Sequence, residues 1–390
     1  MISRIDLELF KCFKLLKLPL EPLTLLTGAN ASGKSTVLQA LVLLHQTILN
    51  HEWSNRIQLN GTELELGTAT DIVDKTYGRR QFGIAIIDNN CSVQWKFNYG
   101  DDKMSMSAPV ETVDVNGQTT ENPKKLRFLL PETLTPPEEN LAQRLRSLTY
   151  LTAERVGPRD GYQLQDPIAT QVVGPRGENA IGLLYQRRDA EVLSPLVLES
   201  APPTLLKQVG ERMKTFFPGT SLIVQLVPQT NIVTLGLRTS DATDFHRPIN
   251  VGFGLTQILP IIIAALAAPS ESLLLIENPE VHLHPAGQAR MGEFLAEVAA
   301  AGIQVLLESH SDHILNGIRR AVKTGKMQAD KVALHFFKPR HEEDELNPQE
   351  EKLVQVISPT LDSSGNIDHW PEGFFDQFDK DLNYFAGWGE

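Results

Sequence analysis

An α/β fold, with a mixed β core and an inserted loop-rich and helical lobe, is predicted by three observations. Short apolar runs at 23–27, 273–277 and 303–307 have the length and composition of buried strands. Helical patterns follow such runs, at Val37 to about Leu49 and at Ala286–Ala301. The chain has 390 residues, which suits one large α/β domain with an insertion, or two lobes.

The composition is that of a soluble globular protein. Hydrophobic residues make up 41% of the chain and charged residues 22%. The cysteines, Cys12 and Cys91, give neither a disulfide framework nor a metal-binding spacing. We therefore expect a reduced, cytoplasmic compartment.

Charge and hydropathy bear on the class of partner. The net charge of −12 argues against non-specific coating of nucleic acid, because such binding relies on Lys and Arg to neutralise phosphates. A local basic groove is compatible with this charge, so DNA stays a candidate partner. The N-terminus lacks the apolar core of a signal peptide, and the longest apolar run, Ile258–Ala268, is too short to span a bilayer. We expect no membrane contact.

Residues 28–36 read GANASGKST and fit the phosphate-loop pattern G-x-x-x-x-G-K-[ST]. A strand precedes the loop and a helix follows it, so backbone N–H groups and the positive end of the helix dipole can bind phosphate. A glycine-rich turn before a buried helix is the alternative interpretation. We expect nucleotide contacts from Gly28, Asn30, Ala31, Ser32, Gly33, Lys34, Ser35 and Thr36, with the Ser35 hydroxyl on Mg²⁺.

Residues 1–98 are expected to form an N-terminal lobe that contains the phosphate loop. Residues 2–27 read as two short strands around a turn at 17–22. The helix after the loop is apolar nearly all round and is expected to be buried. Runs at 82–87 and 92–97 predict a hairpin.

Residues 99–220 are expected to form the inserted lobe, which rejoins the core at 148–159. Residues 99–140 are polar and carry several prolines, which predicts a loop-rich excursion. The stretch 160–185 reads as a broken surface segment, and 193–217 is helical in pattern.

Residues 221–390 are expected to form the C-terminal lobe. Strands at 221–227 and 231–238 precede an apolar helix that ends at Ala268. Two more strand candidates, 332–337 and 353–357, follow the last of the buried runs.

A phosphate loop needs a second strand whose carboxylate holds Mg²⁺, usually through water. The run Leu273–Glu277 supplies four apolar residues and then an acid. Ser35 and Glu277 are therefore the predicted Mg²⁺ ligands. The long stretch between Lys34 and Glu277 fits an ATPase core that is interrupted by an arm or lobe.

The motifs form a set. The phosphate loop, VGFGLTQ at 251–257, LLLIENPEVHLHP at 273–285 and LLESHSDH at 306–313 together resemble the ABC-type ATPases of the SMC, RecF and OLD class. With YLTAERVGPR at 150–159 and WPEGFFDQ at 370–377, the set looks like a stand-alone bacterial branch of that class. The resemblance implies a P-loop NTPase fold of the ABC-ATPase head type, with ATP and Mg²⁺ as cofactors. Leu9–Phe13 resembles the family's opening motif, whose basic residues lie near the nucleotide.

The resemblance also implies how the site works. Two ATP molecules are sandwiched between two heads, and each phosphate loop is completed by the partner's signature helix. That role would fall to Gly252, Phe253 and Gly254, although the family usually has a serine where Gly252 stands. His310 matches the switch histidine that senses the γ-phosphate. A glycine-rich entry to a buried helix is the alternative interpretation of 252–254.

One departure affects catalysis. In the family a glutamate after the Mg²⁺-binding acid orients and deprotonates the attacking water, and here the residue is Asn278. An amide can orient water but cannot accept its proton. Glu280 could serve as the base, hydrolysis could be slow so that ATP acts as a clamp, or the site could bind without turnover. Glu280, Asn278 and His310 are the candidate catalytic residues.

Other polar residues near these motifs have less specific interpretations. The histidines at 282, 284, 310 and 313 do not form a compact ligand set for a metal other than Mg²⁺. Arg155 and Arg159 follow a predicted strand and could contact phosphate or the opposing protomer. Surface salt bridges explain these arginines equally well.

The resemblance implies an ATPase that closes as a dimer or higher oligomer and regulates a separately encoded effector in anti-phage defence or DNA maintenance. A nuclease is the candidate effector. The first alternative is a slow or inactive ATP-binding scaffold, which Asn278 and Gly252 favour. A DNA repair ATPase or an autonomous nuclease is a lesser alternative. The segment after His313 is too short for the Toprim nuclease domain of OLD-like relatives.

Overall fold

A computed structural model describes residues 1–73, 80–166, 172–240, 242–338 and 355–386. The N-terminal segment forms three strands instead of the expected two: β1 (Ile2–Phe10), β2 (Phe13–Pro19) and β3 (Leu23–Gly28). The extra turn lies between β1 and β2, where Leu9 and Lys11 adopt left-handed backbone with φ of 53° and 51°. No glycine, proline or asparagine marks this turn in the sequence, so the sequence did not reveal it.

β1 and β2 belong to an antiparallel sheet with the order β2-β1-β5-β6-β7-β4, and β8 pairs with β7. The predicted hairpin is confirmed as β5 and β6, since Phe82 pairs with Phe97 and Asp88 with Cys91. The remaining strands of this sheet span Arg56–Gln58 (β4), Gln81–Asp88 (β5), Cys91–Asn98 (β6), Ser107–Val115 (β7) and Gln118–Glu121 (β8).

The prediction of a loop-rich excursion over 99–140 holds for 99–106 and 122–135 but is wrong for the strands and the helix that this segment also contains. β7 and β8 extend the N-terminal sheet, and helix α3 (Pro136–Arg146) packs on the phosphate-loop helix, so the sheet continues past the expected boundary at residue 98. Val110, Val113 and Val115 are buried in β7 while polar residues separate them. Pairing with β6 therefore supplies a strand that the polar composition hid.

The core sheet has the order β16-β15-β3-β14-β13-β9. Its strands run parallel except β16, which pairs antiparallel with β15. β14 therefore lies between the strand that precedes the phosphate loop and the strand that ends in Glu277. The additional bounds are Thr149–Leu151 (β9), Leu273–Glu277 (β13), Gln304–Glu308 (β14), Val332–Phe337 (β15) and Val356–Ile357 (β16).

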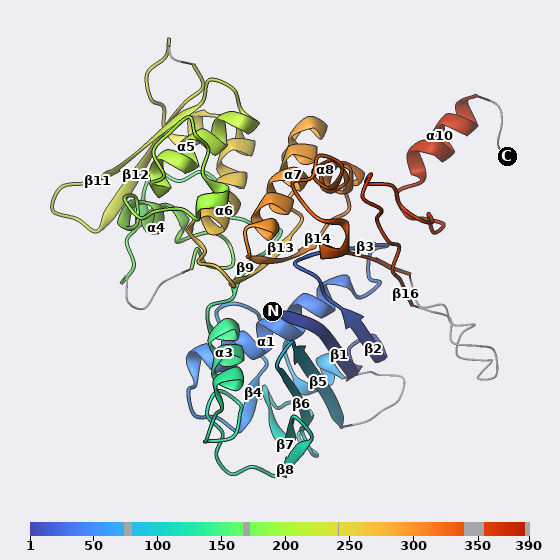
Figure 1. Ribbon diagram of the computed structural model, residues 1–390. Coiled ribbons are helices and arrows are strands. Elements are labelled where there is room, and N and C mark those ends of the chain that lie inside the picture. Colours follow the sequence, from blue (N-terminus) through green and yellow to red (C-terminus); the bar gives the residue numbers. More distant parts are fainter. Residues whose placement is uncertain (74–79, 167–171, 241, 339–354, 387–390) are drawn as a thin grey trace.

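Helix α1 (Lys34–Asn50) lies between the two sheets (Figure 1). Its side chains share one apolar cluster with Leu26 and Leu306 of the core sheet and with Ile84 and Trp95 of the N-terminal sheet. Burial against two sheets explains why this helix is apolar nearly all round, as the sequence predicted. The phosphate loop thus leads into a helix that is buried on both sides.

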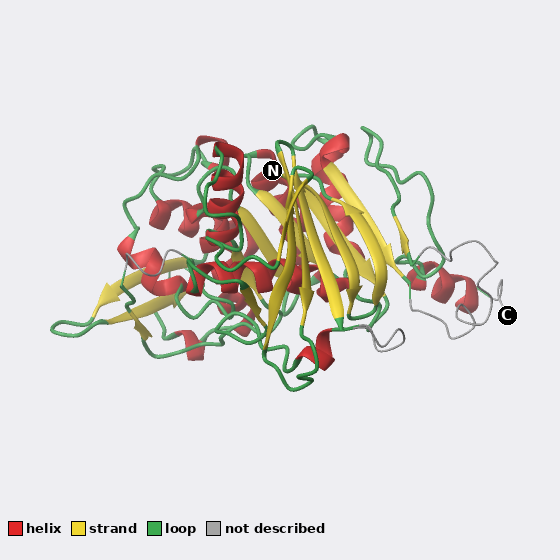
Figure 2. Cartoon of the chain, turned by 90° about the horizontal axis from the view of Figure 1, so that it is seen from below, coloured by secondary structure: helices red, strands yellow, loops and turns green. Residues whose placement is uncertain are grey.

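Helices α6 (Phe253–Ala267), α7 (Pro285–Ala300) and α8 (Asp312–Lys323) pack in the apolar cluster on the other face of the core sheet. A small lobe of α4, α5 and the sheet β10-β12-β11 packs beside α6 and lies at the opposite end of the molecule from helix α10 (Figures 1 and 2). The stretch 160–185, expected at the surface, contains the buried helix α4, so that prediction is also wrong. The bounds are Tyr162–Gln163 (β10), Ala180–Gln186 (α4), Leu205–Phe216 (α5), Ser221–Leu226 (β11), Ile232–Arg238 (β12) and Gln377–Phe385 (α10), with a short helix α2 at Ala69–Ile72.

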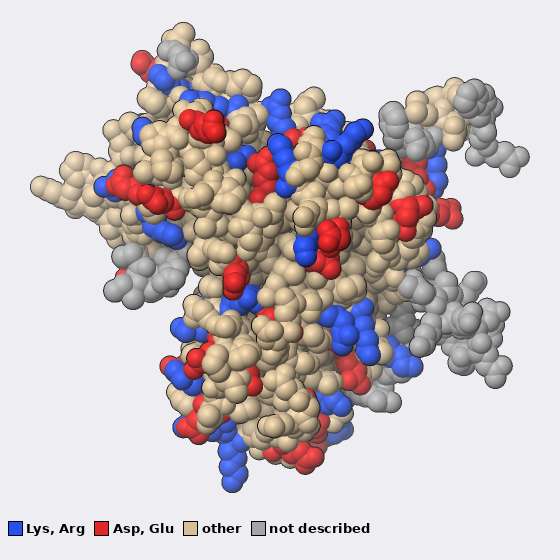
Figure 3. Space-filling view, viewed as in Figure 1, with Lys and Arg blue, Asp and Glu red and all other residues tan. Residues whose placement is uncertain are grey.

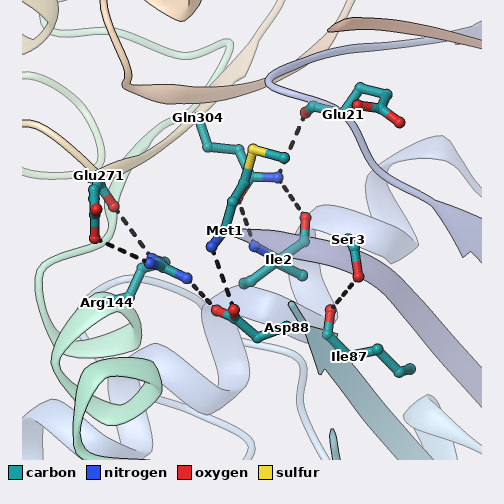
Figure 4. Close-up of polar contacts among 9 residues, drawn as sticks. All are labelled: Met1, Ile2, Ser3, Glu21, Ile87, Asp88, Arg144, Glu271 and Gln304. Carbon is teal, nitrogen blue, oxygen red and sulfur yellow. Dashed lines mark hydrogen bonds and ion pairs between the residues drawn. The ribbon is translucent and has the colours of Figure 1, made fainter. Parts of the chain in front are cut away.

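Polar contacts join the two sheets at the end away from the phosphate loop (Figure 4). The N-terminal ammonium and the Arg144 guanidinium both pair with Asp88, and Arg144 also donates to the backbone oxygen of Glu271 at 3.2 Å. Gln304 accepts from the Ile2 amide at 3.1 Å and donates to the Ile2 oxygen at 2.7 Å. These contacts fix β1 against β14. Among the described residues, no helix combines the length and hydropathy needed to cross a bilayer.

Candidate nucleotide site

The phosphate loop has the close backbone approach that its glycines require. Gly28 has φ of +134° and Gly33 has φ of +101°, a region that side chains rarely adopt. A Cβ atom on Gly33 would lie 2.6 Å from Cys12 Sγ, and one on Gly28 would collide with the Phe337 carbonyl. Both conformation and space therefore restrict these positions to glycine.

Lys34 is 3% exposed and is held inside the loop. Its Nζ donates to the backbone oxygens of Gly28 at 3.1 Å and Ala29 at 2.7 Å. The same atom lies 3.8 Å from Glu308 Oε1. Burial lowers the pKa of Lys34, and the Glu308 carboxylate partly offsets this effect.

A cavity of about 470 Å³ opens over the loop. The predicted contacts from Asn30 to Thr36 line it, together with His310, whereas Gly28 does not. Gln39 and Glu308 also line the cavity, although the sequence did not single them out. Lys11, another lining residue, is the basic residue of the opening motif Leu9–Phe13. The complete lining is Lys11, Cys12, Asn30, Ala31, Ser32, Gly33, Lys34, Ser35, Thr36, Gln39, Glu308 and His310.

Glu308 lines the cavity over the phosphate loop, and the sequence did not single it out. Its side chain is 8% exposed and lies 3.8 Å from Lys34 Nζ. Burial raises the pKa of Glu308, while Ser35 and Lys34 act in the opposite direction. The signal was available, because Glu308 ends an apolar run just as Glu277 does.

Glu277 pairs in register with Glu308 across the parallel strands β13 and β14. Its carboxylate accepts from the Tyr150 hydroxyl at 2.7 Å and from the Ala153 amide at 3.3 Å. Burial, followed by the Glu277 carboxylate, raises the pKa of Tyr150. Glu277 does not line the cavity, and its assignment as a Mg²⁺ ligand stays a prediction.

Asn278 adopts left-handed backbone with φ of +43°, a conformation that asparagine tolerates better than most residues. The backbone N–H of Asn278 donates to the backbone oxygen of Glu308 at 2.8 Å. The side-chain Oδ1 of Asn278 is buried without a hydrogen-bond partner. Glu280 accepts from the His310 amide at 2.9 Å through Oε1, while burial raises its pKa. The three candidate catalytic residues therefore lie on two adjacent loops that are hydrogen-bonded together.

Arg155 has a role that neither sequence interpretation anticipated. It is 5% exposed and donates to the backbone oxygens of Glu277 at 2.9 Å and Asn278 at 2.8 Å. Burial lowers its pKa to about 10. Arg155 thus fixes the turn after β13, which rules out a surface salt bridge. Arg159 is exposed.

His310 lines the cavity, and its ring lies 4.0 Å from Glu308. Burial, and then Lys34, lower the pKa of His310. His284 begins α7 by accepting from the Ala286 amide at 3.4 Å, and the His282 ring packs edge-on against Phe253. In the described part of the chain, no group of three or more His, Cys, Asp or Glu residues is arranged to hold a metal ion.

The predicted signature residues do not line this cavity. Gly252 caps the N-terminus of α6, and Phe253 is 45% exposed. A Cβ atom on Gly254 would lie 2.8 Å from the His282 oxygen, so this glycine permits a close backbone contact. The structure therefore brings His310 to the phosphate loop of the same chain but leaves 252–254 away from it.

A phosphate loop before a helix that lies between two sheets, with the strand that ends in Glu308 beside it, is the arrangement of the P-loop fold of the ABC-ATPase head type. The chain matches family models described as "AAA ATPase domain" over residues 1–171, "AAA domain, putative AbiEii toxin, Type IV TA system" over 178–316 and "Protein of unknown function (DUF3696)" over 327–384. These matches, together with the relatives described next, support an SMC/RecF/OLD-like ABC-type ATPase.

A curated relative is the OLD nuclease of Thermus scotoductus, at 26% identity over 328 residues. The match covers 80% of this chain and 59% of that protein, so the chain spans less than two thirds of its length. An SMC head bound to the C-terminal winged-helix domain of ScpA is similar in structure, with a TM-score of 0.55, 14% identity and coverage of 92% of this chain and 98% of that one. A Pyrococcus furiosus SMC head with an extended coiled coil gives a TM-score of 0.52, 13% identity and 99% coverage of each chain.

The residues around the loop fit the Mg²⁺ and ATP that this class implies. Ser35 and Glu308 offer the oxygen donors that Mg²⁺ prefers. Glu308 Oε2 is buried without a hydrogen-bond partner, which is costly unless a bound group satisfies it. A bound Mg²⁺ would neutralise charge on the phosphates, while Lys34 and the loop amides bind phosphate oxygens.

Proposed function

We propose that this chain binds MgATP at the phosphate loop and hydrolyses it between two copies of itself. The observation that carries the proposal is the cavity lined by residues Asn30 to Thr36 of the loop, Lys34 among them, and by His310. ATPase activity in general is supported by the matched AAA domains. The chain's own residues bind and orient the triphosphate, and His310, which lines the same cavity, would sense the γ-phosphate.

The need for two copies follows from where the signature residues lie. The N-terminus of α6 offers free backbone N–H groups and a positive dipole end, both suited to a phosphate. Gly252 and Phe253 do not line the cavity of their own chain, and Phe253 is 45% exposed. A second copy with its α6 over the first copy's cavity would complete both sites.

Subunit complementation tests this arrangement. Lys34→Ala removes the phosphate cation, and Gly252→Asp puts a negative charge where the proposed γ-phosphate would lie. A Cβ on Gly252 meets only Leu255 at 3.7 Å, so this substitution leaves the fold intact. Each variant alone is expected to be inactive, and a mixture should regain ATPase activity because the mixed dimer contains one intact site.

Gly252→Ser is the matched control, since it adds a hydroxyl without charge and should strengthen ATP-dependent dimerisation measured by light scattering. A mixture that remains as inactive as its components would contradict sharing of the site between copies.

We further propose that the ATP-driven change acts on a separately encoded effector in anti-phage defence or DNA maintenance. The similarity to an OLD nuclease supports a nuclease as the class of effector, and one similar SMC head is bound to a partner's winged-helix domain. Turnover measured with and without DNA and with the product of a neighbouring gene tests this proposal. A rate that no addition changes would contradict it.

A slow ATP-binding scaffold is the second candidate, and Asn278 favours it. This residue stands at the position of the general base, its side chain cannot accept a proton, and its Oδ1 is buried without a partner. In this case hydrolysis is slow, and bound ATP holds two copies of the chain together as a long-lived clamp while a complex assembles. The rate of ATP cleavage in a single turnover and the lifetime of the dimer are measured together. A scaffold is expected to cleave ATP slowly and to have a long-lived dimer, whereas a fast ATPase cleaves ATP quickly and releases its partner.

DNA remains a proposed partner without an assigned surface. Basic side chains gather over α7 and α8 on the face in Figure 3, but acidic residues lie among them. Arg320 lies 3.8 Å from Glu293, and Lys326 lies 2.7 Å from Glu297. These intramolecular pairs offset the positive charge that binding to phosphates would use.

A further inference from the structure

Glu308, at the end of β14, lines the cavity over the phosphate loop, whereas Glu277, at the end of β13, does not. Glu308 Oε1 lies 3.8 Å from Lys34 Nζ, and its side chain lines the same cavity as Lys34 and Ser35. The Glu308 side chain is only 8% exposed. One of its carboxylate oxygens, Oε2, is buried without a hydrogen-bond partner.

The expected Mg²⁺ acid is engaged elsewhere. Both carboxylate oxygens of Glu277 already accept hydrogen bonds, from the Tyr150 hydroxyl and from the Ala153 amide. If Glu277 bound the metal through Oε1, it would have to give up the 2.7 Å hydrogen bond from the Tyr150 hydroxyl. Glu308 can turn its free oxygen to a ligand without such an exchange.

We propose that Glu308 is the carboxylate that faces Mg²⁺ beside Ser35 when nucleotide binds, and that it makes the site selective for the magnesium complex of ATP. This inference rests on the proposed binding of ATP at the phosphate loop. A carboxylate beside a triphosphate repels the metal-free nucleotide, whereas Mg²⁺ between them turns the repulsion into attraction. Arrival of MgATP also releases Lys34 from Glu308 toward the phosphates.

Binding of ATP measured by calorimetry, with Mg²⁺ and separately with EDTA, tests the inference. Wild type is expected to bind MgATP more tightly than metal-free ATP. Glu308→Gln should weaken MgATP binding by about 10- to 100-fold, as the loss of a partner around a metal typically does. The same variant should bind metal-free ATP at least about threefold more tightly, because a nearby negative charge is gone.

Glu277→Gln is the matched control, since it removes the same charge from the adjacent strand. It is expected to change the ratio of the two affinities less than Glu308→Gln does. If Glu308→Gln fails to fold by circular dichroism, Glu308→Asp replaces it, and its shorter side chain should reduce the ratio several-fold.

The inference is overturned if the Glu308 variant keeps the wild-type ratio, or if it weakens both forms of ATP equally, as a merely structural residue would. Failure of the proposed function looks different, because wild type would then bind neither form of ATP and Lys34→Ala would change nothing.

Discussion

Lys34 Nζ and Glu308 Oε1 lie 3.8 Å apart in a pocket where both side chains are more than nine-tenths buried. Lys34 is otherwise held by the carbonyls of Gly28 and Ala29, so the phosphate-binding cation is satisfied within its own chain. Glu308 lacks such a set of partners, because its Oε2 has none. The pair thus links the nucleotide site to the stability of the empty protein.

Lys34→Ala should therefore destabilise the protein as well as abolish ATP binding. Loss of one partner leaves a buried charge without compensation, which we expect to cost about 2 kcal/mol or more of the free energy of unfolding. The double variant Lys34→Ala with Glu308→Gln should regain part of that loss, because no uncompensated charge remains. Denaturant titrations of both variants and of wild type measure the difference. Additive losses would show that the two side chains do not interact.

Glu280→Gln should slow ATP turnover by at least about 100-fold if Glu280 is the general base. The amide oxygen can still accept from the His310 amide, so the loop and the binding of ATP should stay unchanged. The measurement is the steady-state rate at saturating MgATP, with affinity measured separately. A wild-type rate in this variant would remove Glu280 from catalysis and favour the scaffold function.

Asn278→Glu should lower stability and raise turnover. Asn278 has φ of +43°, and a residue that tolerates this conformation less well should cost about 1 kcal/mol. The new carboxylate supplies the proton acceptor that an amide lacks. Thermal unfolding and steady-state turnover measure the two effects, and Asn278→Gly serves as a control that suits the backbone but adds no base. A stable and no faster Asn278→Glu variant would contradict both parts.

Sequence motifs and runs of apolar residues predicted those elements whose structure depends on residues close together in the chain. The phosphate loop, its buried helix and the apolar strands at β13 and β14 were readable because motif and composition fix them. β7 and the role of Arg155 could not be predicted in this way, because each depends on partners that are not adjacent in the sequence. β7 is stabilised by pairing with β6, and Arg155 by the backbone oxygens of Glu277 and Asn278. Glu308 falls between these cases. Its strand was predicted, but only the sheet order shows that this strand lies next to the phosphate loop.

His335 should make stability depend on pH. It is 1% exposed, its Nε2 lies 2.8 Å from the Pro19 oxygen and its Nδ1 lies 2.7 Å from Ser358 Oγ. Burial lowers its pKa from 6.5 to about 4, so between these values the unfolded chain binds a proton that the folded protein does not. Stability is therefore fully present above pH 6.5 and falls as the pH drops toward 4, by at most about 3 kcal/mol from this group.

His335→Gln keeps a donor and an acceptor but cannot titrate, so its stability should fall less than that of wild type over the same range. His45 is also buried with a lowered pKa, but it is present in both proteins and cancels in the comparison. Denaturant titrations at pH 7 and pH 4.5 provide the two differences. Equal losses in the two proteins would mean that His335 accepts a proton as readily in the fold as outside it.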